Sequence, residues 1–151
     1  MKVLIFILLV NINAIVIADN LMSAIIAVES NGKANAIGDN GQAYGILQVH
    51  KSVVQDVNRI YSLRHTHQDM FNPERAKQVF TLYTKYYGDL YQKKAQQPAT
   101  AEIIARIWNG GPNGYNNPAT LKYWKKVKEA IRNEKTQTSL GSMGESNRQS
   151  S

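Results

Sequence analysis

The sequence contains no cysteine, and its 151 residues include three histidines. A disulfide framework and a thiolate metal site are therefore excluded, although the absence of cysteine does not identify a compartment. His65 and His67 stand two residues apart in a polar stretch, which is not the spacing of paired metal ligands on a helix. We therefore expect no metal site and no cofactor.

The chain also lacks an uninterrupted apolar run of the roughly 20 residues that a membrane-spanning helix needs. Residues 3–10 are all apolar, but Asn11 and Asn13 interrupt the apolar pattern beyond residue 10. Residues 1–18 resemble a secretory signal peptide that is cleaved after Ala18. The segment Val16-Ile17-Ala18 has small or compact residues at the positions that a signal peptidase recognises. An uncleaved membrane anchor is the alternative. Cleavage predicts an exported protein, in the periplasm, in the cell envelope or outside the cell, without stable membrane insertion.

The charge balance is strongly basic, with a formal net charge of +7 and a pI near 9.6. Such a balance suits an anionic partner, which could be nucleic acid, a membrane surface or an acidic cell-wall polymer. The sequence has no recognisable nucleic-acid motif, and its basic residues are spread over several predicted helices. We therefore do not expect a nucleic-acid partner.

Capping residues and glycine-rich breaks divide the chain beyond residue 18 into helices. The segment from Asn31 to Gly45 is a polar, glycine-rich loop that could hold a small hairpin. We predict that the helix starting at Pro73 bends or ends at Gly88, and that the last helix ends near Asn133. The predicted helices cover residues 19–30, 52–61, 73–94, 100–108 and 118–133, and they begin at caps such as Asn72 and Thr100.

These elements predict a mostly α fold in one domain, residues 19–133, with a glycine-rich loop after the first helix. Residues 134–151 are rich in Ser, Gly, Gln, Asn and Thr and lack apolar periodicity. They are predicted to form a disordered tail. We expect the protein to be a monomer.

One carboxylate stands where the helical pattern predicts an apolar side chain. At about 100° per residue, Glu29 lies over Ile25 and close to Met22, within the apolar stripe of the first helix. Burial and the negative end of the helix dipole both disfavour ionisation and should raise the pKa of this group. A carboxylic acid that keeps its proton can protonate the leaving oxygen of a glycosidic bond. The alternative is that Glu29 turns outward at a frayed helix end.

Four ordered segments carry a resemblance to a known superfamily. The first begins with Glu29-Ser30 at the end of the first helix and runs through a polar loop to Gly45-Ile46-Leu47-Gln48. Further on come Phe71-Asn72-Pro73, the segment Ile107 to Pro112, and Tyr123 to Val127. Together they are similar to the lysozyme-like superfamily, which includes the SLT-type lytic transglycosylases and the goose-type lysozymes. The matches extend from about Leu21 to Val127.

The resemblance implies a lysozyme-like α domain whose cleft binds peptidoglycan glycan strands, with Glu29 as general acid. It also implies that the Gly45–Gln48 turn and the Trp108–Asn109 region line this cleft. Gln48 would hydrogen-bond a sugar amide, and aromatic rings would face the sugars, although core packing is the alternative for each ring. The substrate-binding residues implied in this way are Ser30, Tyr44, Gln48, Trp108, Asn109 and Tyr123, with Tyr115 as a further aromatic candidate.

The sequence departs from the family pattern at two places. Trp108 stands where the family often has a tyrosine whose hydroxyl helps to hold the catalytic glutamate, and an indole N–H can donate a hydrogen bond but cannot accept one. A serine that transglycosylases usually carry late in the loop has no clear match, because Gly38-Asp39 occupies its place.

The resemblance leaves two reactions open. A lytic transglycosylase needs Glu29 alone and forms 1,6-anhydromuramic acid without consuming water, and we favour this reaction. An inverting hydrolase of the goose type needs a second carboxylate about 6.5–9.5 Å away. Asp39 is the candidate, although Gly-Asp-Asn-Gly is also an ordinary turn sequence. Goose-type enzymes carry a further Asp where this chain has His50.

A non-enzymatic reading is also open, in which the chain is an inactive, secreted glycan-binding module that keeps the cleft without the chemistry. The position of Glu29 within an apolar stripe argues against it. The sequence therefore favours an enzyme that cleaves the glycosidic bond between N-acetylmuramic acid and N-acetylglucosamine.

Overall fold

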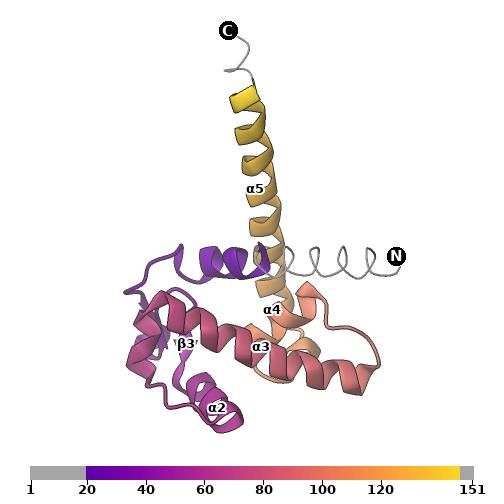
Figure 1. Cartoon of the computed structure of the whole chain (residues 1–151). Helices are drawn as coiled ribbons and strands as arrows, with labels where there is room; N and C mark the ends of the chain where they lie inside the picture. Colours follow the sequence, from indigo (N-terminus) through magenta and orange to yellow (C-terminus); the bar gives the residue numbers. More distant parts are fainter. Residues whose placement is uncertain (1–19, 147–151) are drawn as a thin grey trace, which may run out of the picture.

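Figure 1 shows a computed structural model that describes residues 20–146. The predicted signal peptide, residue 19 at the predicted start of the first helix, and residues 147–151 lie outside the described residues. The first helix is described over residues 20–30. The further helices are α2 (Lys51–Tyr61), α3 (Pro73–Ala95), α4 (Ala101–Gly110) and α5 (Thr120–Ser146), and short 3₁₀ helices are η1 (Asp39–Gly41), η2 (His67–Phe71) and η3 (Gly114–Asn116).

Three two-residue strands form the small sheet that comes after the first helix. β1 (Ile37–Gly38), β2 (Ala43–Tyr44) and β3 (Val49–His50) pair antiparallel in the order β1-β2-β3. Gly38 and His50 both pair with Ala43, from opposite sides of the central strand. The fold is therefore mostly α with a small antiparallel sheet, which confirms the fold class predicted from the sequence.

The predicted caps set the starts of the middle helices. The Asn72 side-chain oxygen accepts hydrogen bonds from the backbone N–H groups of Glu74 and Arg75, at 3.0 and 3.1 Å. The Thr100 hydroxyl accepts one from Ile103 N–H at 3.3 Å. These bonds satisfy donors that a helix start leaves unpaired.

Gly88 does not end α3, which continues to Ala95. A Cβ atom at this position would lie 2.9 Å from the Ile104 side chain. The missing side chain therefore allows α4 to pack closely against α3, and this explains a glycine in a helix interior better than a bend does.

The predicted end of the last helix near Asn133 was wrong, because α5 continues to Ser146. In Figure 1 this helix projects away from the rest of the molecule as a long rod. Residues 135–137 of this helix are exposed, so they need no apolar periodicity, and Glu134, Lys135 and Gln137 all favour helix. Polar composition therefore does not distinguish an exposed helix from a disordered segment.

A single buried core joins the elements that surround the sheet. Its largest fully buried side chains include Ile25 from the first helix, Leu47 beside the sheet, Met70 from η2, Ile107 from α4 and Val127 from α5. The end of the first helix is therefore fixed against both the sheet and the two last helices. Within residues 20–146, no helix has the length and apolar character needed to cross a membrane.

Candidate active site

A cavity of about 260 Å³ lies between the small sheet and the helices. Its lining combines the end of the first helix with the sheet, the start of α2 and the end of α4. The lining residues are Glu29, Asp39, Ala43, Gln48, His50, Val53, Trp108 and Asn109. Five of the residues predicted from the sequence thus meet at one place, namely Glu29, Asp39, Gln48, Trp108 and Asn109.

Glu29 is half-buried at the end of the first helix and turns toward this cavity. Burial raises the pKa of its carboxyl group above the ordinary value of 4.5, and the negative charge of Asp39 adds to this. Hydrogen bonds from Tyr123 and Trp108 and the charge of Lys126 act in the opposite direction without cancelling the effect of burial. The carboxyl group therefore keeps its proton to a higher pH than an exposed glutamate does.

Tyr123 holds the carboxyl group of Glu29 from α5. Its hydroxyl donates a hydrogen bond to Glu29 Oε1 at 2.7 Å, across 94 residues of sequence. From the sequence, the ring was expected to face a sugar, and this contact with Glu29 was missed. No local pattern indicates it, because it depends on how α5 packs against the first helix.

Trp108 occupies the place where the family pattern often has tyrosine, and it packs mainly in the core. Its side chain is 8% exposed and lies edge-on to Phe80 and Tyr83, with ring centroids 4.8 and 5.9 Å apart. Its indole also hydrogen-bonds Glu29. Tyr123 thus supplies from α5 the hydroxyl that Trp108 lacks.

Asp39 lies on the opposite wall of the cavity, in the η1 turn. Its Oδ2 is 2.9 Å from His50 Nε2, and the two side chains are 70% and 40% exposed, respectively. Asp39 and Asn40 both have left-handed backbone conformations, with φ of 49° and 54°. The sequence marked Asp39 as a candidate but did not indicate its pairing with His50.

Gln48 and Ser30 hold the turn between β2 and β3. The Gln48 amide donates to the carbonyls of Gly45 at 2.9 Å and Ala36 at 3.4 Å. The Ser30 hydroxyl donates to the Ile46 carbonyl at 2.8 Å, and Ser30 is not among the residues that line the cavity. Gln48 therefore reaches the cavity from a fixed position, while Ser30 ties the first helix to the turn.

The remaining aromatic candidates, Tyr44 and Tyr115, are not among the residues that line this cavity. Tyr44 is stacked between His67 and Phe71, with ring centroids 3.9 and 4.6 Å apart. Tyr115 packs edge-on against Tyr91 at 4.9 Å. A role for either ring in sugar binding stays a prediction.

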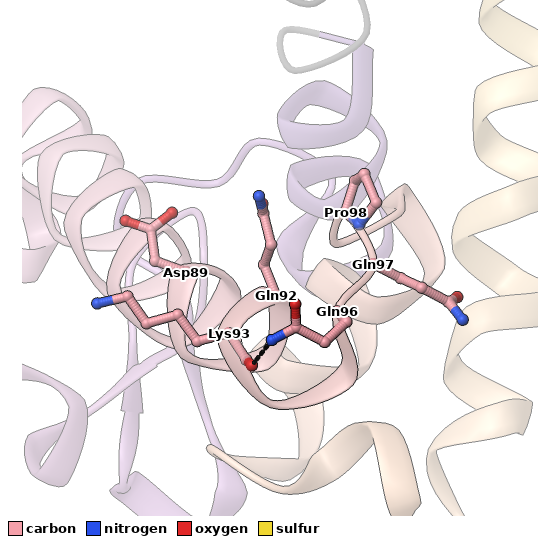
Figure 2. Close-up of a pocket in the computed structure, with 6 residues that line it drawn as sticks. All are labelled: Asp89, Gln92, Lys93, Gln96, Gln97 and Pro98. Carbon is pink, nitrogen blue, oxygen red and sulfur yellow. Dashed lines mark hydrogen bonds between the residues drawn. The ribbon is translucent and has the colours of Figure 1, made fainter.

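A larger hollow, about 420 Å³, lies at the end of α3 and is shown in Figure 2. It is lined by Asp89, Gln92, Lys93, Gln96, Gln97 and Pro98. Asp89 already pairs with Lys85 at 2.7 Å, and the Gln96 amide turns back to the Lys93 carbonyl at 2.7 Å. Since no half-buried acid faces this hollow, we place the candidate site at Glu29. Residues 20–146 contain no group of three or more side chains suited to hold a metal ion.

The residues that form this site lie within a stretch that matches a known protein family. Residues 11–131 match the model of the transglycosylase SLT domain. The chain belongs to this family. The match covers the first helix with Glu29, the sheet with Asp39 and the part of α5 that carries Tyr123, so every part of the site lies inside the family domain.

Relatives of the SLT chain include two molluscan proteins named lysozyme. The chain is 60% identical to the one from Magallana gigas over 30 residues, which are 20% of this chain and 22% of that protein. It is 34% identical to the one from Ostrea edulis over 84 residues, 56% of this chain and 57% of that protein. The matches thus span about a fifth and somewhat over half of these relatives.

The fold is also similar to a chain in the crystal structure of Aeromonas hydrophila PliI in complex with Meretrix lusoria lysozyme. The TM-score is 0.60 at 25% sequence identity, over 73% of this chain and 87% of that chain. Together with the family match, this similarity confirms the lysozyme-like superfamily expected from the sequence.

Proposed function

We propose that this SLT-family chain cleaves peptidoglycan glycan strands between N-acetylmuramic acid and N-acetylglucosamine, with Glu29 as general acid. The observation that carries the proposal is the half-buried Glu29 carboxyl, whose pKa is raised and which faces a cavity. Cleavage begins when this group protonates the bridging oxygen, so that the C1–O bond breaks and positive charge develops on the muramic sugar.

Hydrolysis is the outcome that the arrangement of the cavity supports best. Asp39 lines the same cavity as Glu29 and is close enough for its charge to raise the pKa of Glu29. In this reaction water attacks C1 from the face opposite the leaving oxygen, and the Asp39 carboxylate takes up the water proton. The lysozyme names of the two molluscan relatives support the same outcome. The sequence alone favoured the other reaction.

Lytic transglycosylation is the second candidate, and the name of the matching family supports it. Here Glu29 acts twice. It first protonates the leaving oxygen, and then, as a carboxylate, it accepts the proton of the muramic 6-hydroxyl while that oxygen closes a 1,6-anhydro ring. The N-acetyl group of the substrate supports the positive charge, so the reaction uses neither Asp39 nor water.

Mass spectrometry of the muropeptides released from purified peptidoglycan separates these outcomes. We expect reducing-end products one water heavier than the anhydro forms, and no release by Glu29→Gln. Products that end only in 1,6-anhydromuramic acid would replace hydrolysis by transglycosylation. Retained wall binding without any release would instead indicate the inactive glycan-binding module.

The same proposal places the protein where peptidoglycan is found, in the periplasm or cell envelope or outside the cell, acting as a monomer without a cofactor. The signal peptide predicted for residues 1–18 supports export. Identification of the N-terminal residue of the protein recovered from culture medium or periplasm tests this, and we expect cleavage after Ala18.

A further inference from the structure

The pair formed by Asp39 and His50 links two elements that meet across the central strand. Asp39 comes directly after β1 and His50 ends β3, and both strands pair with β2. The 2.9 Å contact between Asp39 Oδ2 and His50 Nε2 therefore bridges the sheet at the rim of the cavity. Both residues line that cavity together with Glu29.

The backbone of the η1 turn indicates that the position of Asp39 is held from outside. Asp39 and Asn40 are consecutive residues in left-handed conformations, with φ of 49° and 54°. Non-glycine residues persist in such conformations when their surroundings fix them, and they concentrate at functional sites. The contact with His50 fixes the carboxylate at the start of this strained turn.

Structural stability alone does not account for the pair. Its side chains are 70% and 40% exposed, and ion pairs between exposed side chains contribute little to stability. The charged and ionisable groups around His50 are Asp39, Glu29 across the cavity, the adjacent Lys51, and His67, which shares with His50 and Lys51 an adjoining hollow of about 400 Å³. Among these groups, Asp39 is the one in direct contact with the His50 side chain.

We propose that His50 is a positioning residue that, through Asp39, determines whether water or the muramic 6-hydroxyl attacks C1. This inference rests on the proposed function. Once Glu29 has given its proton to the leaving oxygen, the held Asp39 carboxylate accepts a proton from water, and the water oxygen bonds to C1. When Asp39 is not held, the 6-hydroxyl oxygen bonds to C1 and its proton returns to Glu29. His50 therefore directs the partition between the two products without touching the reacting atoms.

Three variants test this role in the full-length protein. His50→Ala removes the contact with Asp39, His50→Gln keeps an N–H donor that can reach the carboxylate, and Lys51→Ala is the matched control for an altered side chain beside the cavity. The assay uses purified peptidoglycan and measures kcat, KM and the ratio of anhydro to reducing-end muropeptides. Thermal unfolding checks that each variant is folded.

For His50→Ala we expect reducing-end products to form about 10- to 100-fold more slowly, which is part of the effect of a general base. We expect KM to change less than about threefold, because the loss falls on the chemical step. The anhydro share should rise at least about tenfold as attack by water weakens. His50→Gln should restore most of the wild-type ratio, and Lys51→Ala should keep it.

An unchanged product ratio in folded His50→Ala would overturn the role of His50, as would a loss that His50→Gln does not relieve. Failure of the proposed function would be seen in different measurements. In that case the wild-type protein would release no muropeptides, or Glu29→Gln would remain active. Exclusively anhydro products from the wild type would overturn both hydrolysis and the water-directing role of His50.

Discussion

The two walls of the cavity hold their carboxyl groups in opposite ways. On the helical side, Glu29 is half-buried, and Tyr123 and Trp108 bond to it from α5 and α4. On the side of the sheet, Asp39 is 70% exposed in a turn with left-handed backbone, and its partner is His50. One wall therefore belongs to the packed part of the molecule, and the other is an exposed turn with left-handed backbone.

This difference suits the two carboxyl groups to the different tasks that we propose for them. An acid that must deliver a proton benefits from burial, which favours the neutral form. A carboxylate that receives a proton from water needs access to water and a fixed direction. Both groups are carboxyl groups, so their different surroundings, rather than their side-chain type, would determine their protonation states and roles.

The largest effect should come from the helical wall. Glu29→Gln removes the proton donor while keeping shape, and we expect kcat on peptidoglycan to fall by about 10²- to 10⁴-fold, the range attributed to general acid catalysis. Glu74→Gln is the matched control, because that exposed carboxylate pairs with Lys77, at 3.0 Å, and does not line the cavity. Turbidity loss of a wall suspension measures both. Comparable activity of the two variants would remove Glu29 from the mechanism.

The sheet wall should give the next effect. Asp39→Asn should slow formation of reducing-end products by about 10²-fold, the lower end of general base catalysis, while anhydro products persist. Asp89→Asn, whose carboxylate pairs with Lys85 on the surface of α3, serves as control. Quantified muropeptides give the result, and an unaltered hydrolysis rate would leave Asp39 with a purely structural part in its turn.

A change that leaves both carboxylates in place sharpens the comparison further. The Tyr123 hydroxyl lowers the pKa of Glu29, so Tyr123→Phe should raise this pKa and move the alkaline limb of the pH–rate profile to higher pH. We expect kcat near neutral pH to fall less than about tenfold, since the proton donor remains. Tyr115→Phe, a ring that packs on Tyr91, should leave the profile in place. An unmoved limb in Tyr123→Phe would show that Glu29 does not set it.

The smallest effect concerns stability. Because the folded state raises the pKa of Glu29, it binds this proton more tightly than the unfolded chain does. The stabilisation from that proton is complete below the ordinary pKa of 4.5 and is lost as pH rises through the folded value. Glu29→Gln should therefore raise the free energy of unfolding at pH 7 by on the order of 1 kcal/mol and leave it unchanged near pH 3. Thermal unfolding at both pH values measures this, and a gain of equal size at pH 3 would speak against burial of the charge as the cause.

The sequence predicted those parts of the molecule that depend on neighbouring residues. Caps at Asn72 and Thr100 define helix starts because they bond within three residues. The helical period placed Glu29 in an apolar stripe, and its raised pKa agrees with that. The glycine-rich loop, which could hold a hairpin, forms a sheet of three very short strands.

Contacts between distant elements could not be predicted in this way. The bond from Tyr123 to Glu29 depends on how α5 packs, and the contact from Asp39 to His50 depends on the register of three two-residue strands. The end of α5 was predicted too early because residues 134–137 are all polar and continue no apolar stripe. Helical periodicity and capping residues therefore predict helices and their starts, but they do not predict which side chains from distant elements come into contact.

The bond that joins Tyr123 to Glu29 also gives the site an order of assembly. The two residues are 94 positions apart, and a ribosome makes the chain from the first helix toward α5. While synthesis proceeds, Glu29 exists long before its hydroxyl partner does. A nascent or prematurely ended chain that stops before Tyr123 therefore carries Glu29 without the hydroxyl that lowers the pKa of its carboxyl group, and this adjustment is made only once α5 has been synthesised.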